Sequence, residues 1–201
     1  TLSGFLITSL LLAEHGATGR VSFARFYTRR VKRLLPASLA CLTAVAVLGA
    51  AEAFQASSKL RREIVAAVLQ VANWNDLLQG ASYADLQGRR SPVAHFWSLA
   101  VEEQFYWVWP LVVALLCKVA RRRRDRAAAL VALAAVGLAA APIIAAVYGP
   151  DVAYLSTPSR LGEILTGAAL AGVLSVVRLR RPWLHWLAPA AVALIVAAAV
   201  V

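Results

Sequence analysis

The chain has 201 residues, of which 61% are hydrophobic, and its mean hydropathy is +0.68. Soluble domains are only about half apolar, so this composition excludes an ordinary soluble fold. The net charge of +11 is gathered in short basic blocks between apolar stretches. This pattern orients membrane helices with the blocks on the cytoplasmic side, and it argues against nucleic acid as a partner.

The apolar stretches are the first predicted elements. A helix needs about 20 residues to cross a bilayer, and each stretch reaches this length or can be extended to it. The sequence therefore predicts an all-α, polytopic transmembrane helix bundle surrounded by membrane lipid. The apolar stretches are residues 34–56, 105–120, 127–148, 161–177 and 184–201.

The N-terminal part is expected to turn once at the cytoplasmic surface. Residues 1–13 form the last part of a span that runs inwards. Residues 15–33 contain two glycines and the basic block RRVKR, and we expect a cytoplasmic connection there. Pro36 would then lie in the first turn of the next span, 36–56, where proline is tolerated.

The central part has both ends on the outer side. The block RRRRDR at 121–126 is cytoplasmic, so the preceding span, 96–120, runs inwards and both ends of 57–95 lie outside. Residues 62–79 are apolar at helical spacing, but the segment is short and polar at both ends. By parity it does not cross, and we interpret it as an interfacial or re-entrant helix that protein or water must surround.

The C-terminal part continues the alternation of spans. Residues 127–148 run outwards, 160–177 run inwards and 184–201 run outwards again. They are joined by an outer loop at 148–151 and by the inner block RLRR at 178–181.

One predicted span carries a polar stripe. Ser98, Glu102 and Tyr106 are spaced i, i+4 and i+8, so they share one helix face. A carboxylate in a span costs about 2.5–3.5 kcal/mol on insertion scales. Glu102 is therefore either an interfacial group that orients the helix end or a buried group that positions a substrate or catalytic partner. Glu103, rotated by about 100°, is interpreted as a structural neighbour.

The histidines and cysteines do not predict a metal site. His95 precedes the polar stripe and either caps the helix or takes part in transfer. His15 and His185 are scattered, and His185, at the start of the predicted span 184–201 and next to an inner basic block, is interpreted as interfacial. Cys41 and Cys117 have no partner at metal-ligand spacing and are interpreted as small buried hydrophobic residues.

A second polar span begins near residue 157. Arg160 and Glu163 are three positions apart and can pair on one helix face. Gly162, Gly167 and Gly172 thin the helix for close packing. The pair is either structural or part of a substrate site.

Basic residues before Pro36 form a candidate anion site. Arg29 opens the block, and Arg30 and Arg33 form an R-x-x-R pair at the cytoplasmic mouth of a span. Arginine presents a rigid fork that suits phosphates. Aromatic residues between positions 23 and 27 are candidates to flank an adenine or a pantetheine. The alternative is that the block only orients the helix.

Five stretches together resemble the acyltransferase 3 family of membrane O-acyltransferases. The most specific is H-F-W-S-L-A-V-E-E-Q-F-Y at 95–106. Their order and spacing extend the resemblance over nearly the whole chain. The other stretches are S-G-F-L-I-T at 3–8, F-Y-T-R-R-V-K-R-L-L-P-A at 26–37, A-N-W-N at 72–75 and S-T-P-S-R-L-G-E-I-L-T-G-A at 156–168.

The resemblance implies a multi-pass enzyme of the bacterial inner (cytoplasmic) membrane. Such enzymes move an acyl group, often acetyl, from acyl-CoA to a hydroxyl of a carbohydrate acceptor such as lipopolysaccharide or peptidoglycan. Acyl-CoA is a co-substrate, and no bound cofactor is expected. By resemblance the residues that hold the CoA phosphates are Arg30 and Arg33, with Arg29 beside them. The catalytic residues are Ser98, Glu102 and Tyr106, with His95. The acceptor-binding residues are Asn73, Trp74, Arg160 and Glu163.

The chain departs from the family at its ends. The family's first span carries a histidine that serves as base or acyl relay, and that span is absent, as are the last of roughly ten bilayer-crossing helices. Residues 1–201 are thus expected to be a partial acyltransferase 3 membrane domain with little or no activity alone. A transporter or flippase, or a non-catalytic membrane scaffold, are the alternatives.

Overall fold

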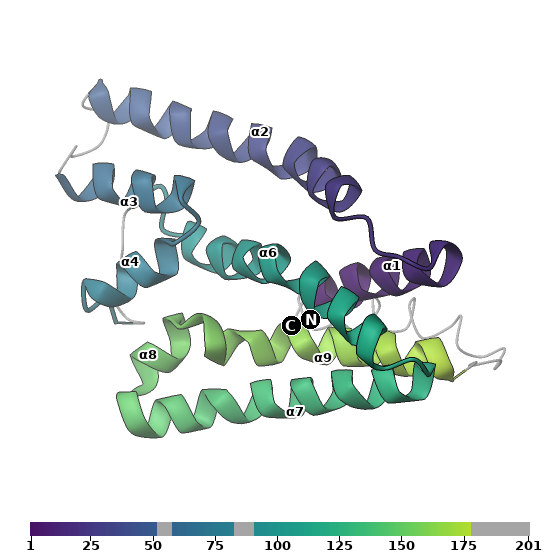
Figure 1. Ribbon diagram of the computed structural model, residues 1–201. Helices are drawn as coiled ribbons and strands as arrows, with labels where there is room; N and C mark the ends of the chain where they lie inside the picture. The colour runs from purple at the N-terminus through teal and green to yellow at the C-terminus, as the bar shows by residue number, and fades with distance from the viewer. Residues whose placement is uncertain (52–57, 83–90, 178–201) are drawn as a thin grey trace, which may run out of the picture.

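The computed structural model describes residues 1–51, 58–82 and 91–177, and this part of the chain contains helices and turns but no strand (Figure 1). The all-α fold predicted from the apolar stretches is confirmed. The predicted span at 184–201 and the inner loop at 178–181 lie outside the described residues. The helices are α1 (Leu2–Thr18), α2 (Phe23–Ala50), α3 (Ser58–Val68), α4 (Ala72–Leu78), α6 (Phe96–Val119), α7 (Arg123–Tyr148), α8 (Pro150–Leu155) and α9 (Thr157–Val176).

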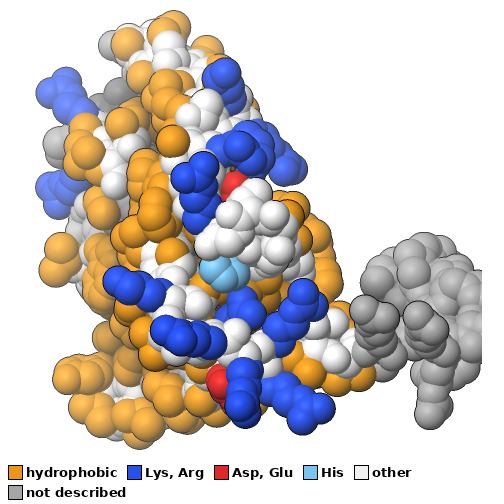
Figure 2. All heavy atoms as spheres, turned by 45° about the vertical axis from the view of Figure 1, so that its right-hand side comes forward, with side chains coloured by type: hydrophobic (Ala, Val, Ile, Leu, Met, Phe, Trp, Pro, Cys, Tyr) orange, Lys and Arg blue, Asp and Glu red, His pale blue; other side chains and the backbone are white. Residues whose placement is uncertain are grey.

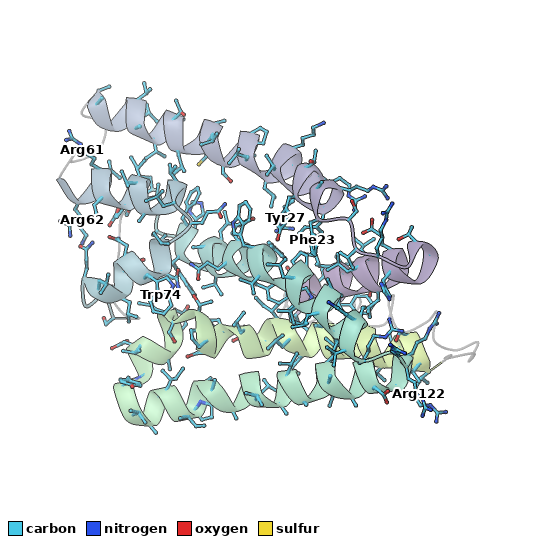
Figure 3. The ribbon with its side chains drawn as sticks, in the orientation of Figure 1. Phe23, Tyr27, Arg61, Arg62, Trp74 and Arg122 are labelled. Atoms are coloured by element: carbon cyan, nitrogen blue, oxygen red, sulfur yellow. The ribbon has the colours of Figure 1, made fainter. Side chains whose placement is uncertain are left out.

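Four of these helices, α2, α6, α7 and α9, are long and apolar enough to cross a membrane. Figure 1 shows the turns after α1 and after α6 at one end of the molecule, and the turn after α7 at the other end. Figure 3 places Arg122 at the first end and Arg61 and Arg62 at the opposite end. This arrangement agrees with the predicted path, in which 121–126 are cytoplasmic and 57–95 lie outside.

The start of α2 differs from the prediction. Residues 23–33 are its first turns, so the prediction that Pro36 lies in the first turn of this span is wrong, and the proline lies inside the helix. The turn is confined to the residues around Gly19, which ends α1 with φ 72°. Residues 23–35 contain no glycine or proline, and their four arginines and two leucines favour a helix. The basic block therefore lies on a helix surface, and Pro36 removes one backbone hydrogen bond of a 28-residue helix.

The segment predicted as one helix over 62–79 is divided into two. Helix α3 ends at Val68 and α4 begins at Ala72, with Gln70 between them at φ 59°. The Gln70 carbonyl, freed by the break, accepts a hydrogen bond from Nε2 of Gln104 at 2.8 Å. Neither α3 nor α4 is among the helices long enough to cross a membrane, as expected for a re-entrant or interfacial segment.

Helix α9 is packed closely on two sides, as its glycines predicted. A Cβ on Gly162 would lie 2.6 Å from the carbonyl oxygen of Gly137 in α7. A Cβ on Gly167 would overlap the carbonyl oxygen of Thr1, next to α1. A Cβ on Gly172 would lie 2.7 Å from Leu130 in α7. Glycines five positions apart point about 140° apart on a helix, so α9 contacts two neighbours through backbone.

Helix α6 is the other central element. In the apolar 18-residue stretch of α6, 44% of the residues are buried, as in the corresponding stretch of α9. In α2 and in α7 the share is 17%. Its inward side packs Val101, Phe105, Trp109 and Val113 against residues of α1 and α9. The side chains of α6 therefore contact most of the other described helices. Its polar residues Glu102, Glu103 and Gln104 contact α1, α2 and α4, respectively.

Candidate active site

Glu102 of α6 is the centre of a hydrogen-bonded group. Its Oε2 accepts one bond from the Ser3 hydroxyl at 3.1 Å and another from the Tyr106 hydroxyl at 2.9 Å. Glu102 is half-buried and Tyr106 is buried, which fits the predicted polar stripe. Both bonds use the same oxygen, and Oε1 has no hydrogen-bond partner among the described residues. Glu102 therefore keeps one acceptor atom for a further group.

Glu103 has a larger role than the sequence indicated. It is only 7% exposed, and its Oε1 lies 3.3 Å from Nη2 of Arg30 in α2. The Arg30 guanidinium also lies over the ring of Tyr106, with 3.0 Å between its Cζ and the ring centroid. A buried arginine is stabilised by an anion and by an aromatic face, and here both come from α6. The signal in the sequence was the presence of opposite charges in two neighbouring apolar helices.

The other two arginines of the basic block are not part of this contact. Arg29 and Arg33 are exposed on α2, while Arg30 is half-buried. The R-x-x-R pair is thus divided: Arg30 binds to α6, and Arg33 remains at the surface. The Nε of Arg30 is buried and has no partner among the described residues, so its donors are not all used.

A cleft lies between α2, α3 and α6 beside this group. Arg30, Glu103 and Tyr106 form one polar part of its lining, Ser38 and Gln70 are also polar, and most of the other lining residues are apolar. At its edge the Tyr27 hydroxyl donates to the Trp107 carbonyl at 2.7 Å, and the two rings stack with centroids 5.3 Å apart. Tyr27 and Phe23 project from the first turns of α2 (Figure 3). The apolar lining residues are Val31, Leu34, Leu35, Leu39, Leu42, Ala67, Val68, Phe96, Leu99 and Ala100.

Ser98 and His95 make no hydrogen bond to Glu102 in the described part of the chain. Both are exposed, and the Ser98 hydroxyl donates to the backbone carbonyl of His95 at 3.1 Å. His95 is the N-cap residue of α6, but its side chain makes no capping hydrogen bond, and its ring packs 4.8 Å from that of Phe96. Within the predicted stripe a hydrogen bond therefore joins Glu102 to Tyr106, whereas the Ser98 hydroxyl is used by the His95 carbonyl.

Asn73 and Trp74 belong to a buried amide network around Gln104. Asn73 is fully buried, and its Nδ2 donates to the Leu155 carbonyl at 3.1 Å and to the Thr157 hydroxyl at 3.0 Å. Its Oδ1 accepts from Gln104 at 3.0 Å. The Trp74 indole, which projects from α4 (Figure 3), donates to the same Gln104 at 3.2 Å. These bonds join α4 to α6, α8 and α9, and no spacing in the sequence points to Gln104 as their centre.

Arg160 and Glu163 form the predicted i,i+3 ion pair, with 2.5 Å between Nη1 and Oε1. Arg160 also donates through Nε to the Tyr154 carbonyl at 2.9 Å. Its guanidinium lies 4.3 Å from the Tyr154 ring centroid and 5.6 Å from that of Trp97. Arg160 therefore packs against the rings of Trp97 and Tyr154 near the start of α9, while its partner Glu163 is largely exposed.

A metal centre is not indicated within the described ranges. No cluster of three or more His, Cys, Asp or Glu residues there has metal-binding geometry. The chemistry that the described groups offer is that of a carboxylate with one open acceptor atom, next to a paired arginine.

The fold and this site define a helical membrane protein with a charged, hydrogen-bonded centre inside an apolar bundle. The chain belongs to the acyltransferase 3 family, because the family model described as an acyltransferase domain matches residues 1–201. The resemblance found in the motifs is confirmed.

Curated relatives cover most of this chain. It is 34% identical over 182 residues to the protein named "Putative peptidoglycan O-acetyltransferase YrhL" of Bacillus subtilis (strain 168), with 89% of this chain and 28% of that protein covered. It is 35% identical over 172 residues to O-acetyltransferase OatA of Staphylococcus aureus (strain NCTC 8325 / PS 47), with 85% and 28% covered. The chain thus spans about 28% of the length of these relatives. No solved structure matches it.

Proposed function

We propose that this chain is part of a membrane O-acetyltransferase of the bacterial cytoplasmic membrane, which acetylates a hydroxyl of a cell-wall glycan. Family membership and the names of the O-acetyltransferase relatives support the reaction class. The name of the Bacillus relative supports peptidoglycan as the acceptor. The observation that carries the proposal is the open Oε1 of Glu102, next to Tyr106 and Arg30 in the bundle.

The reaction requires a base at the acceptor hydroxyl. The hydroxyl oxygen attacks the acyl carbonyl of the thioester donor, its proton passes to the base, and the C–S bond breaks as the thiol leaves with a proton. Glu102 serves this step in one of two ways, either by taking the proton on Oε1 or by orienting an imidazole from another part of the complete protein. In both cases Oε1 must stay free of internal hydrogen bonds.

Ser3 and Tyr106 keep Oε1 free by holding the other oxygen. Their hydroxyls both donate to Oε2, which fixes the plane of the carboxylate. Glu103 and the Tyr106 ring hold Arg30 in place, and Arg30 supplies a positive charge close to the reacting groups. Negative charge that develops on the acyl oxygen during attack is stabilised by such a fixed cation.

The donor in this proposal is acyl-CoA, with acetyl-CoA as the first choice. Arg33 and Arg29 are exposed near the start of α2 and are suited to its phosphates, while Arg30 is directed towards α6. The apolar cleft beside Arg30 suits the pantetheine arm. For the acceptor, Trp97 and Tyr154 offer apolar faces to a sugar ring, and the Arg160–Glu163 pair offers polar contacts. Asn73 and Trp74 support this site indirectly, through Gln104.

The experiment uses the complete protein in membranes that lack other acetyltransferases. Radiolabelled acetyl-CoA is supplied, and label in the peptidoglycan fraction is compared between wild type, Glu102→Gln and the control Glu14→Gln. Glu14 pairs with Arg25 at 3.4 Å near the end of α1, away from the polar centre. Label in wild type and control with a loss of about 100-fold in Glu102→Gln supports the proposal. Equal label in all three, or none in wild type, contradicts it.

A further inference from the structure

A second pocket lies between α1, α7 and α9, and it shares no lining residue with the cleft at Arg30. Its volume is about 660 Å³. Phe5, Leu12 and Leu174 form apolar parts of its lining, while His15, Arg123 and Arg126 make it basic. Figure 2 shows lysine and arginine side chains gathered at this end of the molecule.

The positive charge of this pocket is not balanced by its lining. None of the described residues that line it is acidic, although two are arginines and one is a histidine. Among the described residues, Arg126 makes long contacts of 3.5 Å, to Sγ of Cys117 and to the Arg121 carbonyl. Its Nε is buried and has no hydrogen-bond partner in the described part of the chain. A buried guanidinium donor without a partner costs free energy, and an anion would offset that cost.

The shape of the pocket matches one membrane leaflet. Its lining on α1 extends from Gly16 to Phe5, which are 11 positions or about 16 Å apart along the helix. Half of a hydrocarbon core of about 30 Å is about 15 Å. The basic end lies at the RRRR block, where the helices meet the cytoplasmic surface, and the apolar end extends towards the bilayer centre. A phosphate at one end and a hydrocarbon chain at the other fit this polarity.

The lining argues for a lipid rather than a nucleotide. Of the large rings of Phe, Tyr and Trp that can cover an adenine, the described lining contains only Phe5. Phe5 lies at the far end of the pocket from His15. The basic end therefore offers charge and hydrogen bonds, and its flat faces are limited to the imidazole of His15 and the two guanidinium groups.

We propose that this pocket binds the phosphate of an anionic phospholipid of the inner leaflet, with Arg126 and Arg123 at the headgroup and an acyl chain along α1. Basic pockets between membrane helices on the cytoplasmic side suit such headgroups. The proposal concerns a site other than the one at Glu102 and does not depend on the acetyl-transfer reaction.

Native mass spectrometry of the complete, delipidated protein tests this proposal. The protein is titrated with phosphatidylglycerol, with phosphatidylcholine and with coenzyme A, and the dissociation constant of the first bound molecule is measured. Wild type should bind phosphatidylglycerol at least tenfold more tightly than phosphatidylcholine. Arg126→Gln should weaken phosphatidylglycerol binding about tenfold, as expected for loss of a charged hydrogen bond. Arg122→Gln is the matched control, because it removes the same charge from the same block outside the pocket lining.

Two results would overturn the lipid site. The first is a wild-type protein without preference for phosphatidylglycerol, a result that does not depend on any variant folding. The second is that Arg126→Gln and Arg122→Gln weaken phosphatidylglycerol binding equally. The lipid would then be attracted by the surface charge of the basic block and not by the pocket. If coenzyme A binds and removal of Arg126 abolishes that binding alone, the pocket belongs to a nucleotide and the lipid assignment is wrong.

Discussion

Arg30 and Glu103 join α2 to α6 through an ion pair of 3.3 Å in which both side chains are largely buried. The pair is notable because α2 otherwise approaches α6 mainly through long side chains, such as Tyr27 at Trp107. The same arginine covers the ring of Tyr106, whose hydroxyl binds Glu102. The position of α2 and the geometry of the candidate catalytic carboxylate are thus coupled through one residue.

Removal of Glu103 should destabilise this junction. Glu103→Ala leaves the Arg30 charge without its carboxylate, and loss of one partner of a buried pair costs about 3 kcal/mol. Thermal unfolding of the complete protein in detergent measures the effect. Glu14→Ala is the control, since the arginine it leaves without a carboxylate, Arg25, is 61% exposed to solvent, whereas Arg30 is 22% exposed. Equal shifts in the two variants would contradict a structural role for Arg30–Glu103.

The Tyr106 hydroxyl should matter for turnover more than for folding. Tyr106→Phe keeps the ring under Arg30 but removes the bond of 2.9 Å to Glu102. We expect kcat to fall roughly tenfold to 100-fold, with KM changed much less, because an oriented catalytic group is lost. Label transfer at saturating donor measures kcat.

The control for this variant is Tyr27→Phe. It also removes one tyrosine hydroxyl hydrogen bond, here to the Trp107 carbonyl, and keeps the stacked ring. Its kcat should stay within about twofold of wild type, since Tyr27 does not contact Glu102. If Tyr27→Phe and Tyr106→Phe lose activity to the same extent, the loss comes from packing and the role given to Tyr106 fails.

The glycines of α9 should not tolerate a side chain. Gly162→Val would place carbon atoms into the backbone of Gly137, and overpacking of this kind costs about 1–3 kcal/mol or more. The variant should unfold at lower temperature and be recovered in lower yield. Gly16→Ala is the control, because nothing lies within 4 Å of an added Cβ there, and the helix should gain up to about 1 kcal/mol. If the unfolding temperature and yield of Gly162→Val equal those of wild type, α7 and α9 can move apart without loss of stability.

The amide network around Gln104 should stabilise the end of the bundle at which α4, α8 and the start of α9 meet α6. Asn73→Leu removes the bonds to Leu155 and Thr157 and leaves buried groups unpaired, at about 1–3 kcal/mol for each. Limited proteolysis within α4 should become faster. Gln79→Ala, which removes an exposed amide bonded to Asn75, should leave the proteolysis rate unchanged. Faster cleavage in both variants would mean that the network has no special role.

The fold was largely predictable because apolar length and basic blocks are strong local signals. Helices α6, α7 and α9, the pairing of Arg160 with Glu163 and the close contacts of Gly162 and Gly167 all follow from spacing along one helix. The start of α2 was missed because a proline was used to mark a boundary, whereas the preceding residues already favour a helix. The break at Gln70 was missed because no glycine or proline marks it; its stabilising contact, Gln104, is 34 residues away.

The site was only partly predictable. Glu102 and Tyr106 lie four residues apart on one helix, so their contact follows from helix geometry. Ser3, Arg30 and Glu103 meet through contacts between different helices, and sequence spacing does not encode which faces meet. Ser98 shares the face of Glu102 in sequence, but it lies near the helix start, where the hydroxyl binds the carbonyl three residues before it.

Helix α2 is held by polar contacts at one end and by apolar contacts at the other. Its polar contacts to α6, at Tyr27 and Arg30, lie near its first residues, while its far half meets α3 and α6 through apolar side chains such as Leu42 and Val45. From Tyr27 to Ala50 the helix extends about 35 Å, so a tilt of about 5° at the polar contacts would displace Ala50 by about 3 Å. Apolar contacts are non-directional and permit such sliding. Small rotations at one pair of residues would therefore set the width of the whole cleft.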